Sequence, residues 1–227
     1  MGTELIVTAL LKRQLPYQNA QEEIGNLINF SMLKDERLKV LHKQKFYKFY
    51  SFNNLYPVES DGLYQSGKIY IFRMRFAKQD VAEKMKKCLS GLENRTFKIL
   101  ALELRVLHPR FINMLYTITP CIVTVDSGPF MPDGDLVFLK ERLEINAVKK
   151  YQALFGKQLI NRDFIERIEI INRKPTVTRY KDMTYLGNKI KVFVRSDESS
   201  QKLAGVVTFA GLGEKSSSLG AGFCFVY

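Results

Sequence analysis

The sequence is most distinctive at Gly211-Leu-Gly-Glu-Lys-Ser-Ser-Ser-Leu-Gly-Ala-Gly-Phe-Cys-Phe-Val-Tyr227, where four glycines and three serines fall within the first twelve positions and a short apolar run follows. Glycine lacks a Cβ atom and adopts positive φ readily, so such a loop can bring its backbone close to a ligand. Successive N–H groups in such a loop can bind an anion, and Lys215 adds a positive charge. The composition indicates either a phosphate-binding loop or a glycine-rich turn before a final strand with no ligand.

Two common phosphate-binding motifs do not fit the residues around Lys215. A P-loop requires Gly-Lys followed by Ser or Thr at the start of a helix, but Glu214 precedes Lys215, and the residues from Gly220 onward cannot form a long helix. A dinucleotide-binding fingerprint requires a third glycine where Ser216 stands, again followed by a helix. Any phosphate bound here must therefore be held in another way.

The charge of the chain favours an acidic partner. Its 227 residues include 35 Lys and Arg against 23 Asp and Glu, a net charge of +12. Residues 37–48 contain five basic residues, His42 and no acidic residue, and residues 173–195 contain seven basic residues with only Asp182 opposing them. Clusters so free of acidic residues indicate a binding surface, most often for nucleic acid.

Composition also limits the class of protein. Hydrophobic residues make up 46% of the chain, enough for a core, and the length suits one large domain or two small ones. No apolar run reaches the roughly 18 residues that span a bilayer. Cys88, Cys121 and Cys224 are far apart and predict neither disulfides nor a zinc site, and a cytoplasmic location is expected.

The first half predicts a regular order of strands and helices. Strands are expected at residues 5–11, 46–52, 68–76 and 97–107, and helices at 19–40 and 78–92. The strand at 68–76 has Tyr70, Phe72, Met74 and Phe76 on one face, and the strand at 97–107 has Leu100, Leu102, Leu104 and Val106 on one face. Asn19 is a candidate N-cap of the first helix. This order is the βαββαβ, or ferredoxin-like, arrangement.

The second half begins in the same way. Residues 115–125 and 189–195 are predicted strands, residues 136–155 a helix ended by Gly156, and residues 164–171 and 175–186 extended segments. Residues 199–210 fit either class, because Val206-Val207-Thr208 favours a strand whereas the spacing of apolar residues favours a helix. If this segment is a helix, the second half is also βαββαβ, with the glycine-rich loop between its last helix and last strand.

The chain has two histidines, His42 and His108. Imidazole has an unperturbed pKa of about 6.5, which suits proton transfer near neutral pH. Neither histidine belongs to a metal-binding pattern, so no metal site is predicted. His42 lies among lysines, where it is either a solvated surface residue or a general acid or base flanked by cations. His108, before Pro109 at a strand end, is interpreted as structural.

These features resemble the CRISPR-associated endoribonucleases that cut repeat RNA, in the RAMP superfamily. The segments Ala210-Gly-Leu-Gly-Glu-Lys-Ser216 and Gly220-Ala-Gly-Phe223 resemble the family's terminal Gly-hydrophobic-Gly-x-Lys … Gly-Phe-Gly loop. His42, five further residues and Lys48-Phe-Tyr-Ser-Phe52 resemble its His … Lys-[aromatic or Pro]-Phe-[Ser/Thr]-Phe-Ser segment. The resemblance covers essentially the full length. It departs at Cys224, where the family has glycine, and in the predicted first helix, which lacks the tyrosine that the family often places there.

The resemblance implies a fold and a chemistry. The fold is α+β, with two tandem ferredoxin-like domains: residues 1–110 carry the catalytic histidine, and residues 111–227 carry a basic RNA-binding face and the glycine-rich loop. The chemistry is metal-independent cleavage of CRISPR precursor RNA within its repeats, which produces guide RNAs. A 2′-hydroxyl attacks the adjacent phosphate, giving 2′,3′-cyclic phosphate and 5′-hydroxyl ends. No cofactor is expected.

The same resemblance implies the site residues. His42 is expected to transfer a proton, and Lys48, with Lys45 second, to stabilise charge on the phosphorane. Tyr47 or Tyr50 is expected to hold the hydroxyl or a phosphate oxygen. The residues expected to bind RNA are Gly211, Gly213, Lys215, Gly220, Gly222, Arg173, Lys174, Arg179, Lys181, Lys189, Lys191 and Arg195.

The implied partner is CRISPR repeat RNA, with effector-complex subunits and a second copy of the chain as further candidates and no membrane partner. Two rival classes stay open. A catalytically inactive repeat-RNA-binding subunit of an effector complex would keep the loop and the basic face without using His42. An unrelated basic ferredoxin-like interaction domain would bind protein or membrane and show only weak, nonspecific affinity for RNA.

Overall fold

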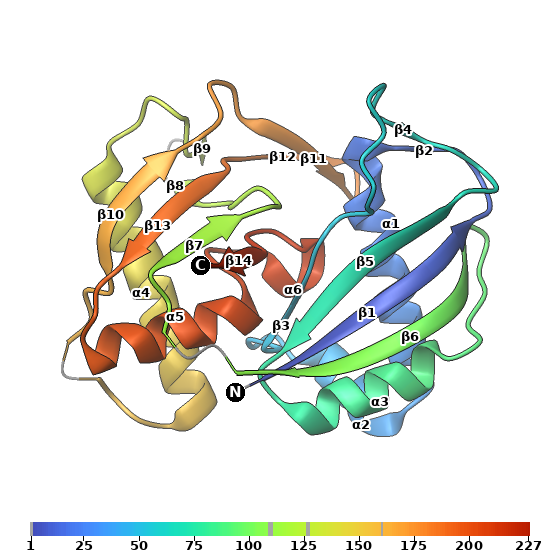
Figure 1. The fold of residues 1–227 in the computed structure, drawn as a ribbon, viewed down its shortest axis with the longest axis horizontal. Helices are drawn as coiled ribbons and strands as arrows, with labels where there is room; N and C mark the ends of the chain where they lie inside the picture. Colours follow the sequence, from blue (N-terminus) through green and yellow to red (C-terminus); the bar gives the residue numbers. More distant parts are fainter. Residues whose placement is uncertain (1, 109–110, 126–127, 160) are drawn as a thin grey trace.

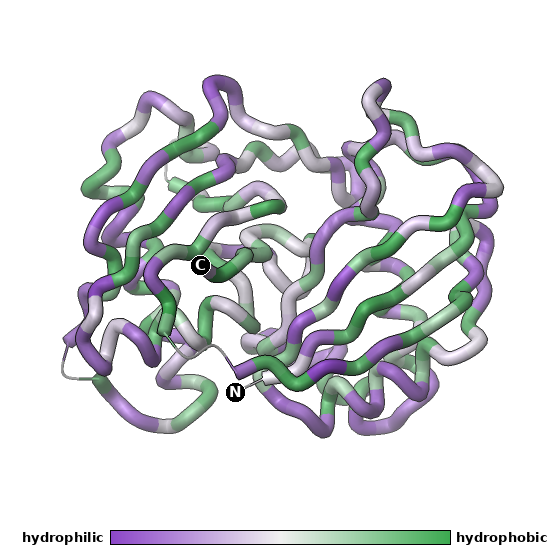
Figure 2. Tube along the Cα trace, viewed as in Figure 1, coloured by the Kyte–Doolittle hydropathy of each residue, from purple (hydrophilic) through white to green (hydrophobic). Residues whose placement is uncertain are grey.

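The computed structural model describes residues 2–108, 111–125, 128–159 and 161–227. Its strands form two four-stranded antiparallel sheets that lie side by side, each with helices packed against it (Figure 1). The predicted combination of helices with antiparallel sheets is confirmed. Along the strands of both sheets hydrophilic and hydrophobic residues alternate (Figure 2), as expected when one face of a sheet is buried.

The first sheet has the strand order β3-β5-β1-β6. In chain order, these strands and the helices packed against them are β1 (Gly2–Leu11), α1 (Tyr17–Met32), α2 (Glu36–Lys43), β3 (Tyr50–Phe52), β5 (Ile69–Phe76), α3 (Gln79–Leu89) and β6 (Phe97–Leu107). The predicted inward face of β5 is confirmed, because Tyr70, Phe72, Met74 and Phe76 are all buried. A two-stranded ladder of β2 (Leu15–Pro16) and β4 (Leu63–Tyr64) lies beside this sheet.

The second sheet has the strand order β10-β13-β7-β14. In chain order, these strands and the helices of the same half are β7 (Met114–Thr117), α4 (Leu136–Phe155), β10 (Ile165–Ile170), β13 (Ile190–Val194), α5 (Glu198–Ala210), α6 (Ser216–Leu219) and β14 (Cys224–Val226). The ambiguous segment 199–210 is thus helical. The glycine-rich stretch, with α6 inside it, lies between α5 and β14, and Figure 1 shows α6 between the two sheets.

Two smaller ladders complete the second half. One pairs β8 (Thr124–Val125) with β9 (Gly128–Pro129). The other is a hairpin of β11 (Thr176–Tyr180) and β12 (Met183–Gly187), which extends onto α1 of the first half (Figure 1). At its tip the backbone N–H of Lys181 donates a hydrogen bond to the Glu22 side chain at 2.8 Å. The hairpin therefore brings a predicted basic segment against the N-terminal half.

Each half buries its own hydrophobic cluster, one drawn from residues 5–99 and the other from residues 112–224. A small third cluster of Ile122, Leu219 and Ala221 lies at the glycine-rich stretch. The predicted boundary between residues 110 and 111 adjoins residues 109–110, which lie outside the described part of the chain, and residues 126–127 lie outside it as well.

The prediction of a single helix over residues 19–40 is wrong. The chain forms α1 and α2 instead, because the Asp35 side chain accepts hydrogen bonds from the N–H groups of Arg37 and Leu38 at 2.9 and 3.0 Å and so begins a new helix. Asn19 is not the N-cap of α1, since that helix begins after Pro16. The first helix also contains a tyrosine after all, Tyr17 in its first turn, stacked on Tyr64.

Two predicted strands are shorter than expected, and a third has the expected bounds but a different inward face. Only Tyr50–Phe52 of the segment 46–52 is a strand, and β7 ends well before Pro120. In β6 an irregularity opposite Thr8 and Ala9 inserts one residue, so the inward alternation changes phase along the strand. Leu100 is therefore exposed rather than inward, Leu102 and Leu104 are half-buried, and Val106 is exposed.

Candidate functional site

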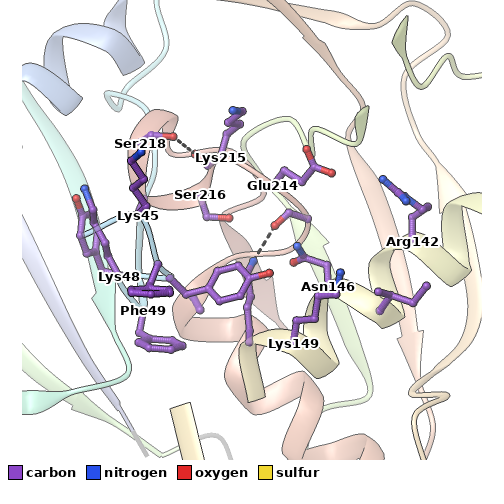
Figure 3. A pocket seen from close by; sticks show the side chains of 18 residues that line it. Lys45, Lys48, Phe49, Arg142, Asn146, Lys149, Glu214, Lys215, Ser216 and Ser218 are labelled. Carbon is purple, nitrogen blue, oxygen red and sulfur yellow. Dashed lines mark hydrogen bonds between the residues drawn. The ribbon is translucent and has the colours of Figure 1, made fainter. Parts of the chain in front are cut away.

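A cavity of about 620 Å³ lies where the two halves meet. Three segments line it: the loop between α2 and β3, one face of α4, and the glycine-rich stretch before and within α6. Its basic residues are Lys45, Lys48, Arg142, Lys149, Lys150 and Lys215, and Glu214 is its one acidic residue among those described. Figure 3 shows Lys45 and Lys48 on one side of the cavity and Arg142 and Lys149 on the other, with Lys215 on the glycine-rich stretch between them. The cavity is thus strongly cationic.

Helix α2 positions His42. Asp35 caps the start of this short helix and also pairs with Lys84 at 3.2 Å, which fixes the helix against α3. His42 then falls in the last turn of α2, and the chain leaves the helix at Gln44 to form the loop that lines the cavity. At Phe49 this loop has a φ of 53°, a conformation uncommon for a residue other than glycine. His42 itself does not line the cavity.

The surroundings of His42 favour its neutral form. Partial burial lowers the pKa of His42 below its usual value, and the nearby ammonium groups of Lys48 and Lys181 lower it further. Its Nδ1 atom is enclosed and has no hydrogen-bond partner among the described residues. A neutral imidazole near neutral pH is suited to accepting a proton.

The other predicted catalytic residues differ in access. Lys45, Tyr47 and Lys48 all line the cavity, and burial lowers the pKa of Lys48. Burial, and then the negative charge of Glu214, raises the pKa of Tyr47, so its phenol stays protonated. Tyr50 is 1% exposed, with its hydroxyl 3.9 Å from the Met32 sulfur. Of the two candidate tyrosines, Tyr47 is therefore the accessible one.

The four glycines of the terminal stretch are buried. A Cβ atom on Gly222 would lie 1.8 Å from the Leu212 carbonyl oxygen, and one on Gly220 would lie 2.6 Å from that of Phe52. Close packing within the protein thus accounts for these two glycines, and contact of Gly211, Gly213, Gly220 and Gly222 with RNA stays a prediction. Lys215 is exposed and has a φ of 59°.

The buried Lys150 holds the glycine-rich stretch from below. Lys150 is only 3% exposed, and its Nζ atom donates hydrogen bonds to the carbonyl oxygens of Gly211 and Gly213, both at 2.7 Å. Burial lowers the pKa of Lys150 to about 8. Its ammonium also lies 5.9 Å from the centre of the Tyr47 ring. One side chain of α4 thus contacts both other walls of the cavity.

Ser216 lies at the same place. It lines the cavity and is 6% exposed, but its Oγ atom is enclosed and has no hydrogen-bond partner among the described residues. Unpaired buried hydroxyls are uncommon because each costs free energy. The enclosed hydroxyl packs against Gly211, where a Cβ atom would lie 2.5 Å from it.

The predicted RNA-binding lysines and arginines of residues 173–195 lie in different surroundings. Lys181, at the hairpin tip, lies near enough to His42 for its charge to lower the pKa of that histidine. Arg179 and Lys189 line a separate groove of about 760 Å³ beside the start of α1. Neither this groove nor the cavity is lined by the remaining four, Arg173, Lys174, Lys191 and Arg195. Contact of these residues with RNA stays a prediction.

The prediction from sequence missed the contribution of α4. Arg142, Asn146 and Lys149 lie four and three residues apart, so they share one face of the helix, and all three line the cavity (Figure 3). The spacing was visible in the predicted helix 136–155. What the sequence did not show is which segments pack against that face.

No helix in the described ranges combines the length and apolar character needed to cross a bilayer. No group of three or more histidine, cysteine, aspartate or glutamate side chains there is arranged to hold a metal ion.

No protein-family model matches the chain. In sequence it is similar to the CRISPR-associated endoribonuclease Cas6 2 of Methanocaldococcus jannaschii, with 27% identity over 86% of this chain and 87% of that protein. In structure it is similar to a RAMP protein described as binding different RNA substrates, with a TM-score of 0.80 and 18% identity over 99% of both chains. A solved CRISPR-associated Cas6 protein superposes with a TM-score of 0.76 and 19% identity over 100% of both chains. In sequence the chain is thus similar to a CRISPR-associated endoribonuclease, and its fold is similar to that of solved Cas6 and RAMP proteins.

Proposed function

We propose that the protein is an endoribonuclease that cleaves CRISPR precursor RNA within its repeats, without a metal ion, to produce guide RNAs. The observation that carries the proposal is the cationic cavity built with the glycine-rich stretch, whose lining includes Lys45 and Lys48, shortly after His42 in the chain. The charges of Lys48 and Lys181 act on His42. Similarity to a protein named as a CRISPR-associated endoribonuclease supports the same conclusion.

The proposed reaction is an internal transesterification. Neutral His42 accepts the proton of the 2′-hydroxyl as that oxygen bonds to phosphorus, and the bond from phosphorus to the 5′-oxygen breaks. The products carry a 2′,3′-cyclic phosphate and, once the leaving oxygen gains a proton, a 5′-hydroxyl. Lys48, with Lys45 second, stabilises the negative charge on the phosphorane, and Tyr47 donates a hydrogen bond to a phosphate or hydroxyl oxygen. Because His42 lies outside the cavity lining, the RNA backbone has to pass between His42 and Lys48.

We also assign two tandem ferredoxin-like domains, residues 1–110 and 111–227. Each sheet places its four strands, numbered along its own half, in the order 2-3-1-4, and each half has its own hydrophobic cluster. The catalytic side chains then come from the first domain, and the glycine-rich stretch and α4 from the second. CRISPR repeat RNA is the proposed partner.

The reaction is tested with a panel of CRISPR repeat RNAs incubated with the protein in EDTA. Each RNA is paired with a version that carries a single 2′-deoxynucleotide before the mapped cut. We expect cleavage of the all-ribose RNA alone, with a cyclic phosphate on the 5′ fragment. Cleavage that requires added metal, or that proceeds at the deoxy position, would contradict the proposed chemistry.

A second candidate function is a catalytically inactive repeat-RNA-binding subunit. The position of His42 outside the cavity lining, with Nδ1 enclosed, is the observation that favours it. In that case the whole panel would be bound and none of it cut.

A further inference from the structure

Helix α4 presents a cationic strip to the cavity. Arg142, Asn146 and Lys149 lie on one face of the helix, opposite the loop that carries Lys45 and Lys48 (Figure 3). The strip adds two positive charges to a wall that the proposed catalytic residues do not occupy.

The cations of the strip are available to a ligand. Arg142 and Lys149 form no ion pair with the described acidic residues. Arg142 donates a single hydrogen bond, at 3.2 Å, to the Thr124 carbonyl, and both side chains are exposed. Exposed basic residues that gather at a cavity without acidic partners bind phosphate groups readily.

The size of the cavity favours a single RNA strand over a duplex. At about 620 Å³ it falls in the range of roughly 300–1,000 Å³ typical of pockets for small ligands, which admits a short run of one strand but not two paired strands. Phe46 also lines it and is 81% exposed. Exposed aromatic rings stack on unpaired bases and bind single strands without sequence readout.

We infer that the α4 strip is a phosphate-binding subsite that holds a single-stranded RNA segment across the cavity from Lys48. The inference rests on the proposed function only for the identity of the natural RNA. Arg142 and Lys149 contact phosphates in this arrangement, and Phe46 contacts a base.

The test measures binding of a single-stranded 2′-O-methyl-uridine oligonucleotide, which cannot undergo 2′-hydroxyl cleavage, over a range of salt concentrations. The variant is Arg142→Gln/Lys149→Gln. The matched control is Lys140→Gln/Lys157→Gln, which removes the same charge from the same helix region but outside the cavity lining. The slope of log affinity against log salt should become shallower by roughly 1.4 in the variant, about 0.7 for each lost phosphate contact. The control should keep the wild-type slope.

The same titrations with the oligonucleotide paired to its complement should show no difference between variant and control. Equal loss of slope in variant and control, an equal response of the duplex, or absence of single-strand binding by the wild-type protein would each overturn the inference. Cleavage of ribose RNA is scored separately on the same proteins. A wild-type protein that binds through the strip but cuts nothing would refute the proposed function and leave the strip established.

Discussion

The chemistry proposed for this protein depends on the charge state of one histidine. His42 lies near two ammonium groups, of which Lys48 comes from the same loop region and Lys181 from the hairpin of the other half. Both disfavour the imidazolium form, in addition to the effect of burial. Because its pKa is lowered, His42 stays neutral, and so able to act as a base, at a lower pH than a free imidazole would.

We predict that Lys181→Met raises the pKa of His42 back toward its usual value of about 6.5. Removing a positive neighbour makes the protonated imidazole less unfavourable, so the acid limb of the pH profile of kcat/KM should move to higher pH. Lys189→Met, which removes a predicted RNA-binding cation that does not act on His42, should leave the limb in place. Identical limbs in both variants would show that His42 does not set the profile.

At this scale the sequence predicted one side of the site. The spacing from His42 to Lys48 pointed to the pair, and the resemblance assigned their roles. The nearness of Lys181 and the face of α4 could not be predicted, because both depend on how distant segments pack. Tyr50 shows the converse, since its sequence position suited catalysis but its side chain fills the core.

At the scale of elements, the glycine-rich stretch is shaped by packing. Two parts of the stretch pack so closely that the Leu212 carbonyl oxygen occupies the space that a Cβ atom on Gly222 would need. Lys150 then fixes the first arm of the stretch through two carbonyl groups. The loop thus has one defined conformation before any ligand arrives, which places Lys215 and Ser216 at the cavity.

We predict that Gly222→Ala destabilises the protein far more than Gly67→Ala. Both glycines have positive φ, at 65° and 80°, so each substitution costs about 1–2 kcal/mol of backbone strain. Only Gly222 has a carbonyl oxygen in the way, whereas Gly67 faces open space. Thermal unfolding of the two variants compares them directly, and similar melting temperatures would refute the packing explanation.

Elements with a clear periodicity were predicted correctly, among them β5 and α4. The errors fall where a single residue changes the local structure. Asp35 starts a new helix inside an apparently continuous one, and an inserted residue in β6 reverses which side chains point inward. Neither event changes the periodicity of the sequence enough to be seen without the neighbouring strand or helix.

At the scale of the whole molecule, Arg75 joins the two halves. This residue is 6% exposed, pairs with Glu4 at 2.8 Å in the first sheet, and donates to the carbonyl oxygens of Thr208 and Cys224 in the second half. Its guanidinium also lies 4.5 Å from the centre of the Phe223 ring. Arg75 is therefore one of the buried contacts that set the relative position of the two halves.

We predict that Arg75→Met lowers the free energy of unfolding by about 3–5 kcal/mol, because it leaves Glu4 buried with only the Arg73 partner. The double variant Glu4→Gln/Arg75→Met should lose less than the two single losses combined. Arg105→Met, which breaks an exposed pair with Glu103, should change stability little. Additive losses in a denaturant titration would show that Arg75 and Glu4 act independently.

The contact between the halves is the part of the fold that the sequence did not reveal. The order of strands and helices within each half followed from periodicity, once residues 199–210 are known to be helical. The sequence does not indicate that Arg75 is buried, because an arginine that alternates with apolar residues along a strand is usually solvated. The cavity is formed by that contact, so its cationic lining could only be seen in the structure.

The central claim, that His42 is the catalytic group beside the cationic cavity, is tested most directly by single-turnover cleavage of a repeat RNA by the His42→Ala variant. RNA affinity is measured in parallel. We predict a rate lower by roughly 10²–10⁴-fold with little change in affinity, because the cations proposed to bind the RNA line the cavity and are kept in this variant. A His42→Ala protein that cleaves at the wild-type rate would contradict it.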